Sequence, residues 1–168
     1  MKPASPLLIR DCEPSDMTAV QAIYSDQVLT GTASFEDVPP TLDEMLARRS
    51  AVLAHGCPYL VAERDGTIIG FAYAGPHRTR PAYRHTVENT VYLDPAATRQ
   101  GAARALMEAA IDRCTRAGFK QMIAVIGDEN PASVAFHAAI GFRVAGRLDK
   151  VGFKFGRWLD STLMQREL

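Results

Sequence analysis

The chain has 168 residues, 47% of them hydrophobic, and its 19 basic and 19 acidic side chains cancel at pH 7. This length suits one compact domain, residues 1–168, with enough apolar residues to form a core. The charge balance argues against a general nucleic-acid binder, which usually carries a basic excess. No apolar run approaches the roughly 20 residues that a membrane span requires, so no membrane partner is expected.

The cysteines argue against a disulfide framework. Cys12, Cys57 and Cys114 are odd in number and far apart, so neither disulfides nor a CxxC metal site is predicted, and we expect buried or semi-buried thiols. Residues 1–10 lack the apolar core and cleavage site of a signal peptide. We therefore expect a cytoplasmic protein without a bound metal.

The first half of the chain alternates apolar runs with turn and cap residues. Glu13–Asp16 supply turn and cap chemistry, Pro39-Pro40 break the chain, and Thr41 can cap a helix. Asp65-Gly66 is the strongest hairpin signal in the sequence. The expected elements are a strand at Leu7–Cys12, a helix after residue 16 to about Leu29, a helix at Leu42–Ala54, strands at Tyr59–Arg64 and Thr67–Ala74, and a cationic loop at Gly75–Arg84.

The second half contains a long amphipathic helix and further strands. Apolar residues recur at helical spacing between Gly101 and Ala117, and Gly118 ends that run. The run at Lys120–Ile126 is continuously apolar, so we expect a strand buried on both faces. The other expected elements are a strand at Thr86–Leu93, a short helix at Asn130–Ile140 that Gly141 closes, and strands near Phe142–Leu148 and Trp158–Gln165. The order β-α-α-β-β-β-α-β-α-β-β does not alternate strictly, which disfavours a plain doubly wound sheet.

The most informative local pattern is a strand, a small-residue turn and a long helix. The strand ends at Leu93 and the helix begins near Gly101; successive backbone N–H groups at such a helix start form an anion site. Small side chains at Gly101 and Ala103 would let a pyrophosphate approach the backbone. An ordinary strand-to-helix turn has the same pattern, whereas a dinucleotide fold would require G-x-G-x-x-G. The predicted ligand contacts here are Val91, Tyr92, Leu93, Arg99, Gln100, Gly101, Ala102, Ala103 and Arg104.

This turn resembles the pyrophosphate loop of the GNAT acetyltransferases, Q/R-x-x-G-x-G/A, with Thr98 where the family usually has Gln or Arg. Longer blocks, in the right order, look like the phosphinothricin acetyltransferase subgroup, which includes methionine sulfoximine and sulfone acetyltransferases. These blocks are Thr32–Glu36, Arg80–Tyr83, Thr86–Tyr92, Ala124–Gly127 and Val151–Trp158. The resemblance implies an α/β (α+β) fold: a GNAT-like mixed, mostly antiparallel sheet flanked by helices, in a single domain. It also implies acetyl-CoA as the acetyl donor, bound between the strands at 86–93 and 120–126, and a homodimer.

Glu88 is the candidate general base. An attacking amine must lose a proton near the acetyl carbonyl, so the reaction requires a base there. Strand alternation places Glu88 on the same face as Thr86 and Tyr92. On the pattern alone a solvated strand glutamate is the favoured interpretation, but the resemblance reverses this, because Glu88 matches the residue proposed as base in the family. Backbone N–H groups near Val91 and Leu93 are expected to polarise the carbonyl.

The short helix after residue 126 offers Asn130, Ser133 and His137 along one face, because they are three and four residues apart. The resemblance implies that Asn130, with Ser133 beside it, contacts the CoA arm. It also implies that His137, which stands where the wider family has tyrosine, protonates the departing thiolate; an imidazole suits such a step near neutral pH. A structural histidine is the alternative, so His137 ranks below Glu88 as a catalytic residue.

A cationic loop precedes Glu88 and contains His77, Arg78, Arg80, Arg84 and His85. Guanidinium forks suit the carboxylate, phosphinate or sulfoximine of an amino-acid substrate, although such loops are often simply solvated. The predicted substrate-binding residues are Phe35, Arg78, Arg80, Tyr83, Thr86 and Glu88. By resemblance, the segment around Phe35 and the segment 154–158 help to close the site, within the chain or across a dimer interface.

The sequence therefore predicts an N-acetyltransferase that moves acetyl from acetyl-CoA directly to the α-amine of a small anionic amino acid. Two alternatives stay open. One is acetylation of protein N-termini or lysines, which would favour an open groove over a closed cationic loop. The other is a catalytically silent acyl-CoA-binding sensor, which would not need Glu88.

Overall fold

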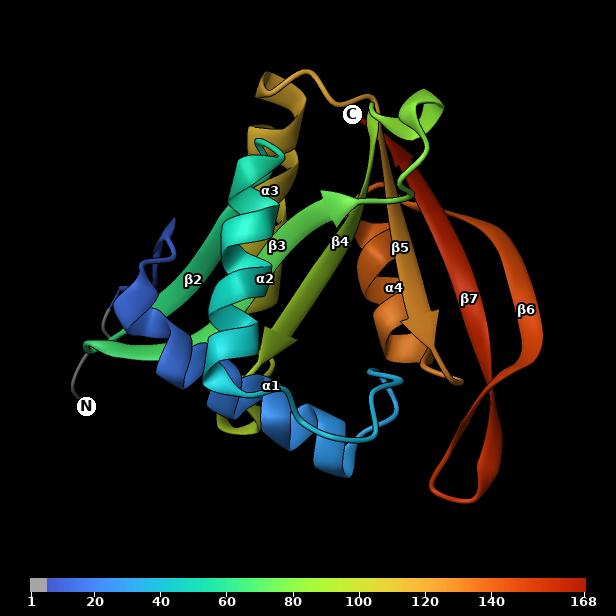
Figure 1. Ribbon diagram of the computed structural model, residues 1–168, viewed down its shortest axis with the longest axis horizontal. Helices are drawn as coiled ribbons and strands as arrows, with labels where there is room; N and C mark the ends of the chain where they lie inside the picture. Colours follow the sequence, from blue (N-terminus) through green and yellow to red (C-terminus); the bar gives the residue numbers. More distant parts are fainter. Residues whose placement is uncertain (1–5) are drawn as a thin grey trace.

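The computed structural model describes residues 6–168. These residues form one seven-stranded sheet with helices packed on it (Figure 1). Its strand order is β1-β2-β3-β4-β5-β7-β6. Within the described residues, β4 and β5 pair in parallel and every other neighbouring pair is antiparallel. The predicted mixed, mostly antiparallel sheet is confirmed. The strands are β1 Leu8–Asp11, β2 Tyr59–Arg64, β3 Thr67–Pro76, β4 Thr86–Leu93, β5 Gln121–Gly127, β6 Arg143–Lys154 and β7 Arg157–Glu167.

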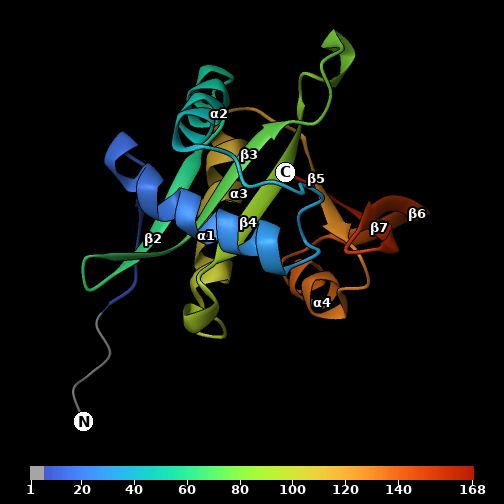
Figure 2. The ribbon, with the colours of Figure 1, turned by 60° about the horizontal axis from the view of Figure 1, so that its bottom comes forward.

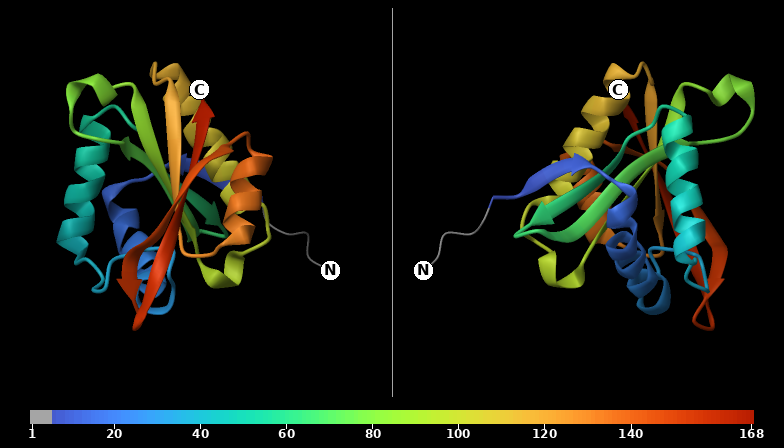
Figure 3. Two further views of the ribbon diagram at one scale, coloured as in Figure 1. Left: turned by 90° about the vertical axis from the view of Figure 1, so that its right-hand side faces the viewer. Right: turned by 60° about the vertical axis from the view of Figure 1, so that its left-hand side comes forward.

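Helices cover both faces of the sheet. The helices α1 and α2 lie on one face and α3 and α4 on the other (Figure 3). Their bounds are α1 Met17–Thr30, α2 Leu42–Ala54, α3 Ala102–Arg116 and α4 Pro131–Ala139, with short 3-10 turns at Pro14–Asp16, Pro81–Tyr83 and Pro95–Ala97. Among residues 6–168, none of the helices combines the length and apolar character that a membrane crossing requires.

Local chemistry explains the element ends that the sequence predicts well. Thr41 Oγ1 accepts a hydrogen bond from the Glu44 N–H (3.2 Å), and Glu44 Oε2 accepts one from the Thr41 N–H (2.6 Å), so a capping box starts α2. Asp65 and Gly66 have φ values of 51° and 73°, which a type I′ hairpin requires, and they join β2 to β3 as predicted.

The core confirms the helical periodicity read from the sequence. Leu106, Met107 and Ala110 of α3 are fully buried against the sheet. The predicted thiols are confirmed as well, because all three cysteines are free and buried.

Two expectations about the C-terminal half were wrong. The strand β5 is not buried on both faces: Met122, Ala124 and Ile126 are buried, but Val125 is 43% exposed because it borders a cavity. The last two strands are also longer than predicted, and a tight turn at Phe155 and Gly156, with φ values of 51° and 74°, joins them.

Candidate active site

A cleft forms where β4 and β5 separate. These strands pair only at Thr86–Gln121, Val87–Met122 and Glu88–Ile123, and then diverge (Figure 1). A cavity of about 300 Å³ opens between them. Its lining residues are Ala33, Phe35, Glu88, Asn89, Thr90, Val91, Tyr92, Ala124, Val125, Ile126, Gly127, Asn130, Ser133, His137 and Ser161.

The backbone of β4 presents polar groups to this cleft. At the start of β4, the Thr86 carbonyl oxygen accepts a hydrogen bond from the backbone N–H of the residue that follows β3 (3.2 Å). Just after the end of β4, the Asp94 N–H donates to the backbone carbonyl of the opposite residue in β3 (2.9 Å). Hydrogen-bonding direction alternates along a strand, so the even-numbered residues of β4 face β3. Val91 and Leu93 therefore direct their N–H groups to the opposite edge, where β5 has moved away. This is the orientation that the predicted polarising role requires.

Glu88 borders the cavity and is oriented by a histidine. His77 Nδ1 lies 3.2 Å from Glu88 Oε2, and the two side chains are 20% and 39% exposed. The His77 ring also meets the Tyr83 ring edge-on, with 5.9 Å between centroids. The carboxylate is thus reachable by a ligand while its position is restrained.

His137 is buried, with 4% of its surface exposed. Its Nδ1 lies 2.8 Å from the Ser133 carbonyl oxygen, which can only accept, so Nδ1–H is the donor. Burial lowers the pKa of His137 and keeps the ring neutral. The Nε2 atom is then unprotonated, and it lies 3.2 Å from Asn89 Nδ2. In this form neither ring nitrogen can donate a proton to a ligand in the cavity. The acid role of His137 stays a prediction.

The cationic loop does not enter the cleft. Arg78, Arg80 and Tyr83 line a separate hollow of about 430 Å³, with the Arg78 guanidinium 6.0 Å from the Tyr83 ring centroid. Figure 2 shows this β3–β4 connection projecting beyond the sheet. His77 links the loop to Glu88, and Thr86 does not border the cavity. Of the predicted substrate-binding residues, Phe35 and Glu88 therefore border the cleft, Arg78, Arg80 and Tyr83 line the separate hollow, and Thr86 borders neither.

The predicted phosphate turn has the backbone shape of an anion site. Gly101 has φ +82° and open space where a Cβ would be, Arg99 has φ +61°, and α3 begins directly afterwards. Residues 99–104 do not border the cavity between β4 and β5. Arg104 Nε lies 2.8 Å from Glu108 Oε1 on the same helix, so the carboxylate of Glu108 partly neutralises the charge of Arg104.

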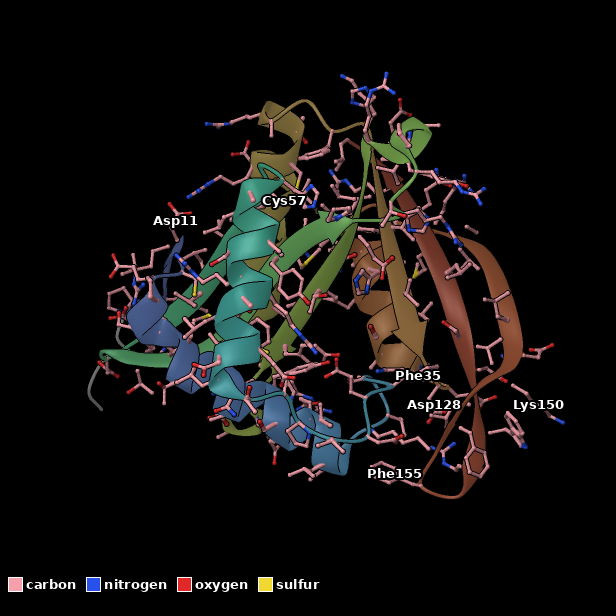
Figure 4. The ribbon with its side chains drawn as sticks, viewed as in Figure 1. Asp11, Phe35, Cys57, Asp128, Lys150 and Phe155 are labelled. Atoms are coloured by element: carbon pink, nitrogen blue, oxygen red, sulfur yellow. The ribbon has the colours of Figure 1, made fainter. Side chains whose placement is uncertain are left out.

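The two segments predicted to close the site meet within one chain. Lys154, only 3% exposed, donates from Nζ to the carbonyl oxygens of Gly31 (2.9 Å) and Ser34 (2.8 Å). The Phe35 ring fits over Gly152 of β6 and Gly127 of β5, beside the cavity. Figure 4 shows Phe35 near Asp128 at the end of β5, with Phe155 at the tip of the β6–β7 hairpin.

Asp128 also holds the Phe35 segment against the β6–β7 hairpin. Its Oδ2 accepts hydrogen bonds from Thr32 Oγ1 (2.9 Å) and Arg157 Nη2 (2.5 Å). The Arg157 guanidinium is the main cause that lowers the pKa of the Asp128 carboxyl to about 2. The loop before Phe35 is therefore joined to β5 and β7 by polar contacts as well as by packing.

Comparison with known proteins decides the family. A model of the acetyltransferase (GNAT) domain matches residues 9–163. The chain belongs to the GNAT acetyltransferase family. It is 53% identical to a phosphinothricin N-acetyltransferase from Alcaligenes faecalis over 161 residues, which span 95% of this chain and 82% of that protein.

Two further proteins are similar to nearly the whole chain at lower identity. The chain is 38% identical to an L-methionine sulfoximine/L-methionine sulfone acetyltransferase from Salmonella typhimurium, over 96% of this chain and 95% of that one. The crystal structure of a phosphinothricin acetyltransferase from Sinorhizobium meliloti in complex with acetyl-CoA superposes with a TM-score of 0.94 at 45% identity, covering 96% of this chain and 88% of that chain.

In this GNAT fold, the position of Phe35 should depend on Gly152. A Cβ at position 152 would overlap the Phe35 ring, so Gly152→Ala should displace that ring and weaken substrate binding about tenfold. Gly146→Ala is the matched control, because no atom lies within 4 Å of a Cβ added there on the same strand. Substrate KM for both variants checks this, and equal KM values would show that the Phe35 position does not affect binding.

Sequence reasoning missed several cleft residues of this GNAT site. Asn89 and Thr90 follow Glu88 in β4, Val125 was expected to be buried, and Ser161 lies on β7 opposite Gly127. The only available signal was an amide directly beside the candidate base, in a strand otherwise rich in Val and Thr.

Proposed function

We propose that this GNAT protein transfers acetyl from acetyl-CoA to the α-amine of a small anionic amino acid of the phosphinothricin or methionine sulfoximine type. The observation that carries this proposal is the position of Glu88, at the point where β4 and β5 separate and beside a cavity of about 300 Å³. The names of the relatives support the substrate class, and the nearby cationic loop supports an anionic group on the substrate.

The cleft fits the acetyl donor. Val91 and Leu93 direct backbone N–H groups into the gap, and Asn130 and Ser133 border it on the other side. The turn at Gly101 offers an open, left-handed backbone for the pyrophosphate. Acetyl-CoA supplies the activated thioester: a C–N bond forms to the amine as the C–S bond breaks, and the CoA thiol leaves.

Glu88 is the proposed base for direct transfer. Its carboxylate takes the ammonium proton. His77 Nδ1, 3.2 Å from Glu88 Oε2, keeps the carboxylate oriented toward the cavity. An acylated cysteine would require an accessible thiolate. Burial raises the pKa of the Cys12 and Cys57 thiols to about 11, so both are protonated near neutral pH. These observations favour direct attack of the amine over a covalent enzyme intermediate.

Arg78 and Arg80 are the proposed readers of the substrate's anionic group. Arg78→Ala and Arg80→Ala should each raise the amino-acid KM by about tenfold or more, because a charge-assisted hydrogen bond is typically worth about 1.5–3 kcal/mol. Arg116→Ala is the control, since that side chain is 78% exposed and pairs with Asp112 on α3. If both loop variants kept the wild-type KM, the loop would not read the substrate.

A panel of amines tests the proposed activity. Phosphinothricin, methionine sulfoximine, methionine sulfone, methionine and a short peptide are each incubated with acetyl-CoA, and release of free thiol is followed. Turnover concentrated on the first three supports the proposal. Preference for the peptide would instead indicate a protein acetyltransferase. Tight acetyl-CoA binding without turnover of any amine would indicate a sensor.

We also propose that the protein is a cytoplasmic homodimer. A reducing compartment suits its free, buried cysteines. A second copy suits the β6–β7 hairpin, because this hairpin exposes several large apolar side chains and exposed apolar surface can mark an interaction site. These residues, each 46–61% exposed, are Val144, Leu148, Val151, Phe153, Phe155 and Trp158. Sedimentation at twice the 18.3 kDa chain mass would support the dimer.

A further inference from the structure

A chain of hydrogen bonds connects α4 to β4 beside the cleft. It runs from the Ser133 carbonyl to His137 Nδ1 (2.8 Å), and from His137 Nε2 to Asn89 Nδ2 (3.2 Å). The Asn89 Nδ2 atom also lies 3.7 Å from Met107 Sδ. At the end of the chain, Asn89 Oδ1 is shielded from solvent and has no hydrogen-bond partner within residues 6–168.

The direction of each bond in this chain follows from its first member. A carbonyl oxygen can only accept, so His137 Nδ1 carries the proton. A neutral ring, required because His137 is 4% exposed, must then accept at Nε2. Asn89 Nδ2 is consequently the donor, and its second hydrogen faces the weak acceptor Met107 Sδ. If the Asn89 amide were reversed, its oxygen would face two acceptors, His137 Nε2 and Met107 Sδ. The atom of Asn89 that has no hydrogen-bond partner is therefore its carbonyl oxygen.

We propose that Asn89 binds the ligand in the cleft by accepting a hydrogen bond from one of its N–H groups, and that His137 is the positioning residue that holds Asn89 in this orientation. Solvent does not reach Asn89 Oδ1 in the structure, so the side chains that cover it must shift as the ligand enters, and the hydrogen bond then formed offsets the desolvation of that oxygen. The inference rests on the proposed function for the identity of the ligand. It gives Asn89 a ligand-binding role and gives His137 a role that involves no proton transfer.

Two ligands could supply the N–H group: the amide-containing arm of acetyl-CoA and the amine of the amino acid. Strand alternation places Asn89 on the face of β4 that carries α3 and α4, opposite to Glu88. The amine must approach Glu88 to lose its proton. The amide arm of acetyl-CoA is therefore the source that the geometry favours.

The state of the His137 ring is measured first, without any ligand. Two-dimensional ¹H–¹⁵N spectra of the imidazole nitrogens at pH 7 should show a neutral ring protonated at Nδ1. Asn89→Asp replaces the donor amide by an anionic acceptor, so it should raise the pKa of His137. A ring protonated at Nε2 in the wild type, or an unchanged pKa in Asn89→Asp, would overturn the assigned orientation.

Binding is measured next by calorimetry with acetyl-CoA alone. Asn89→Leu removes the acceptor at similar volume, so Kd should rise roughly two- to tenfold, the usual value of one hydrogen bond. Asn89→Asp keeps an acceptor oxygen and should weaken binding less. A higher amino-acid KM with unchanged acetyl-CoA Kd would assign the N–H to the amine. If both constants stayed at wild-type values, Asn89 would bind no ligand. Calorimetry needs no turnover, so this result is independent of the proposed reaction.

The role of His137 is separated from acid catalysis by two variants. In His137→Gln, an amide oxygen can accept from Asn89 but cannot donate an acidic proton, whereas His137→Leu offers neither group. A positioning role predicts that kcat/KM of the Gln variant exceeds that of the Leu variant about tenfold. Equal losses in the two variants, with unchanged melting temperatures, would show that His137 acts as the acid and contradict the positioning role.

Discussion

Glu88→Gln should lower kcat by about 10²–10⁴-fold, the usual contribution of a positioned base. Glutamine keeps the size of the side chain and can still accept a hydrogen bond from His77, which lies 3.2 Å from the carboxylate. It cannot take the ammonium proton. Because only the proton transfer is removed, the acetyl-CoA Kd should change little, and steady-state kinetics together with calorimetry would show the two effects separately.

Glu167→Gln is the matched control for this variant. Glu167 is an exposed strand glutamate at the end of β7 that does not border the cavity, so Glu167→Gln should turn over substrate at the wild-type rate. If Glu88→Gln also turned over at the wild-type rate, deprotonation would have to use water or backbone carbonyls. The assignment of Glu88 as base would then be wrong.

Gly101→Glu should weaken acetyl-CoA binding by about a hundredfold or more. The turn offers open space at φ +82°, so a glutamate there would bring bulk and a negative charge against the pyrophosphate. Two like charges about 4 Å apart near a protein surface repel by about 4 kcal/mol. Calorimetry with acetyl-CoA measures the loss, and the melting temperature reports the cost of a side chain at positive φ.

Gly118→Glu separates charge at the turn from backbone strain. Gly118 has φ +91° and open space at the other end of the same helix, so the variant carries the same charge and similar strain away from the cleft. Its acetyl-CoA Kd should match the wild type. An unchanged Kd in Gly101→Glu as well would mean that the turn is only structural.

The fold was largely predictable because local signals agree with tertiary packing. The Thr41 cap, the Asp65-Gly66 turn and the apolar period of α3 each depend on residues close together in the chain. The burial of β5 was not predictable in this way. Val125 is apolar but borders a cavity, since β4 diverges from β5 after three pairs, and this separation is a property of the whole sheet.

The site was predictable only in part for the same reason. Glu88, Asn130, Ser133 and His137 border one cavity, as the family resemblance implied, whereas helical spacing alone placed only the last three on one face. Asn89 was missed because its role depends on a partner 48 residues away, which no local pattern reveals.

The central claim is direct acetyl transfer to a small anionic amino acid, and one measurement tests it most directly. Acetyl-CoA labelled with ¹³C in the acetyl group is mixed with the protein and phosphinothricin, and the label is followed by NMR. We predict that the label appears on the α-nitrogen of the amino acid, with one free thiol released for each acetyl group transferred. Label that remained on CoA, became free acetate or attached to the protein would contradict the account.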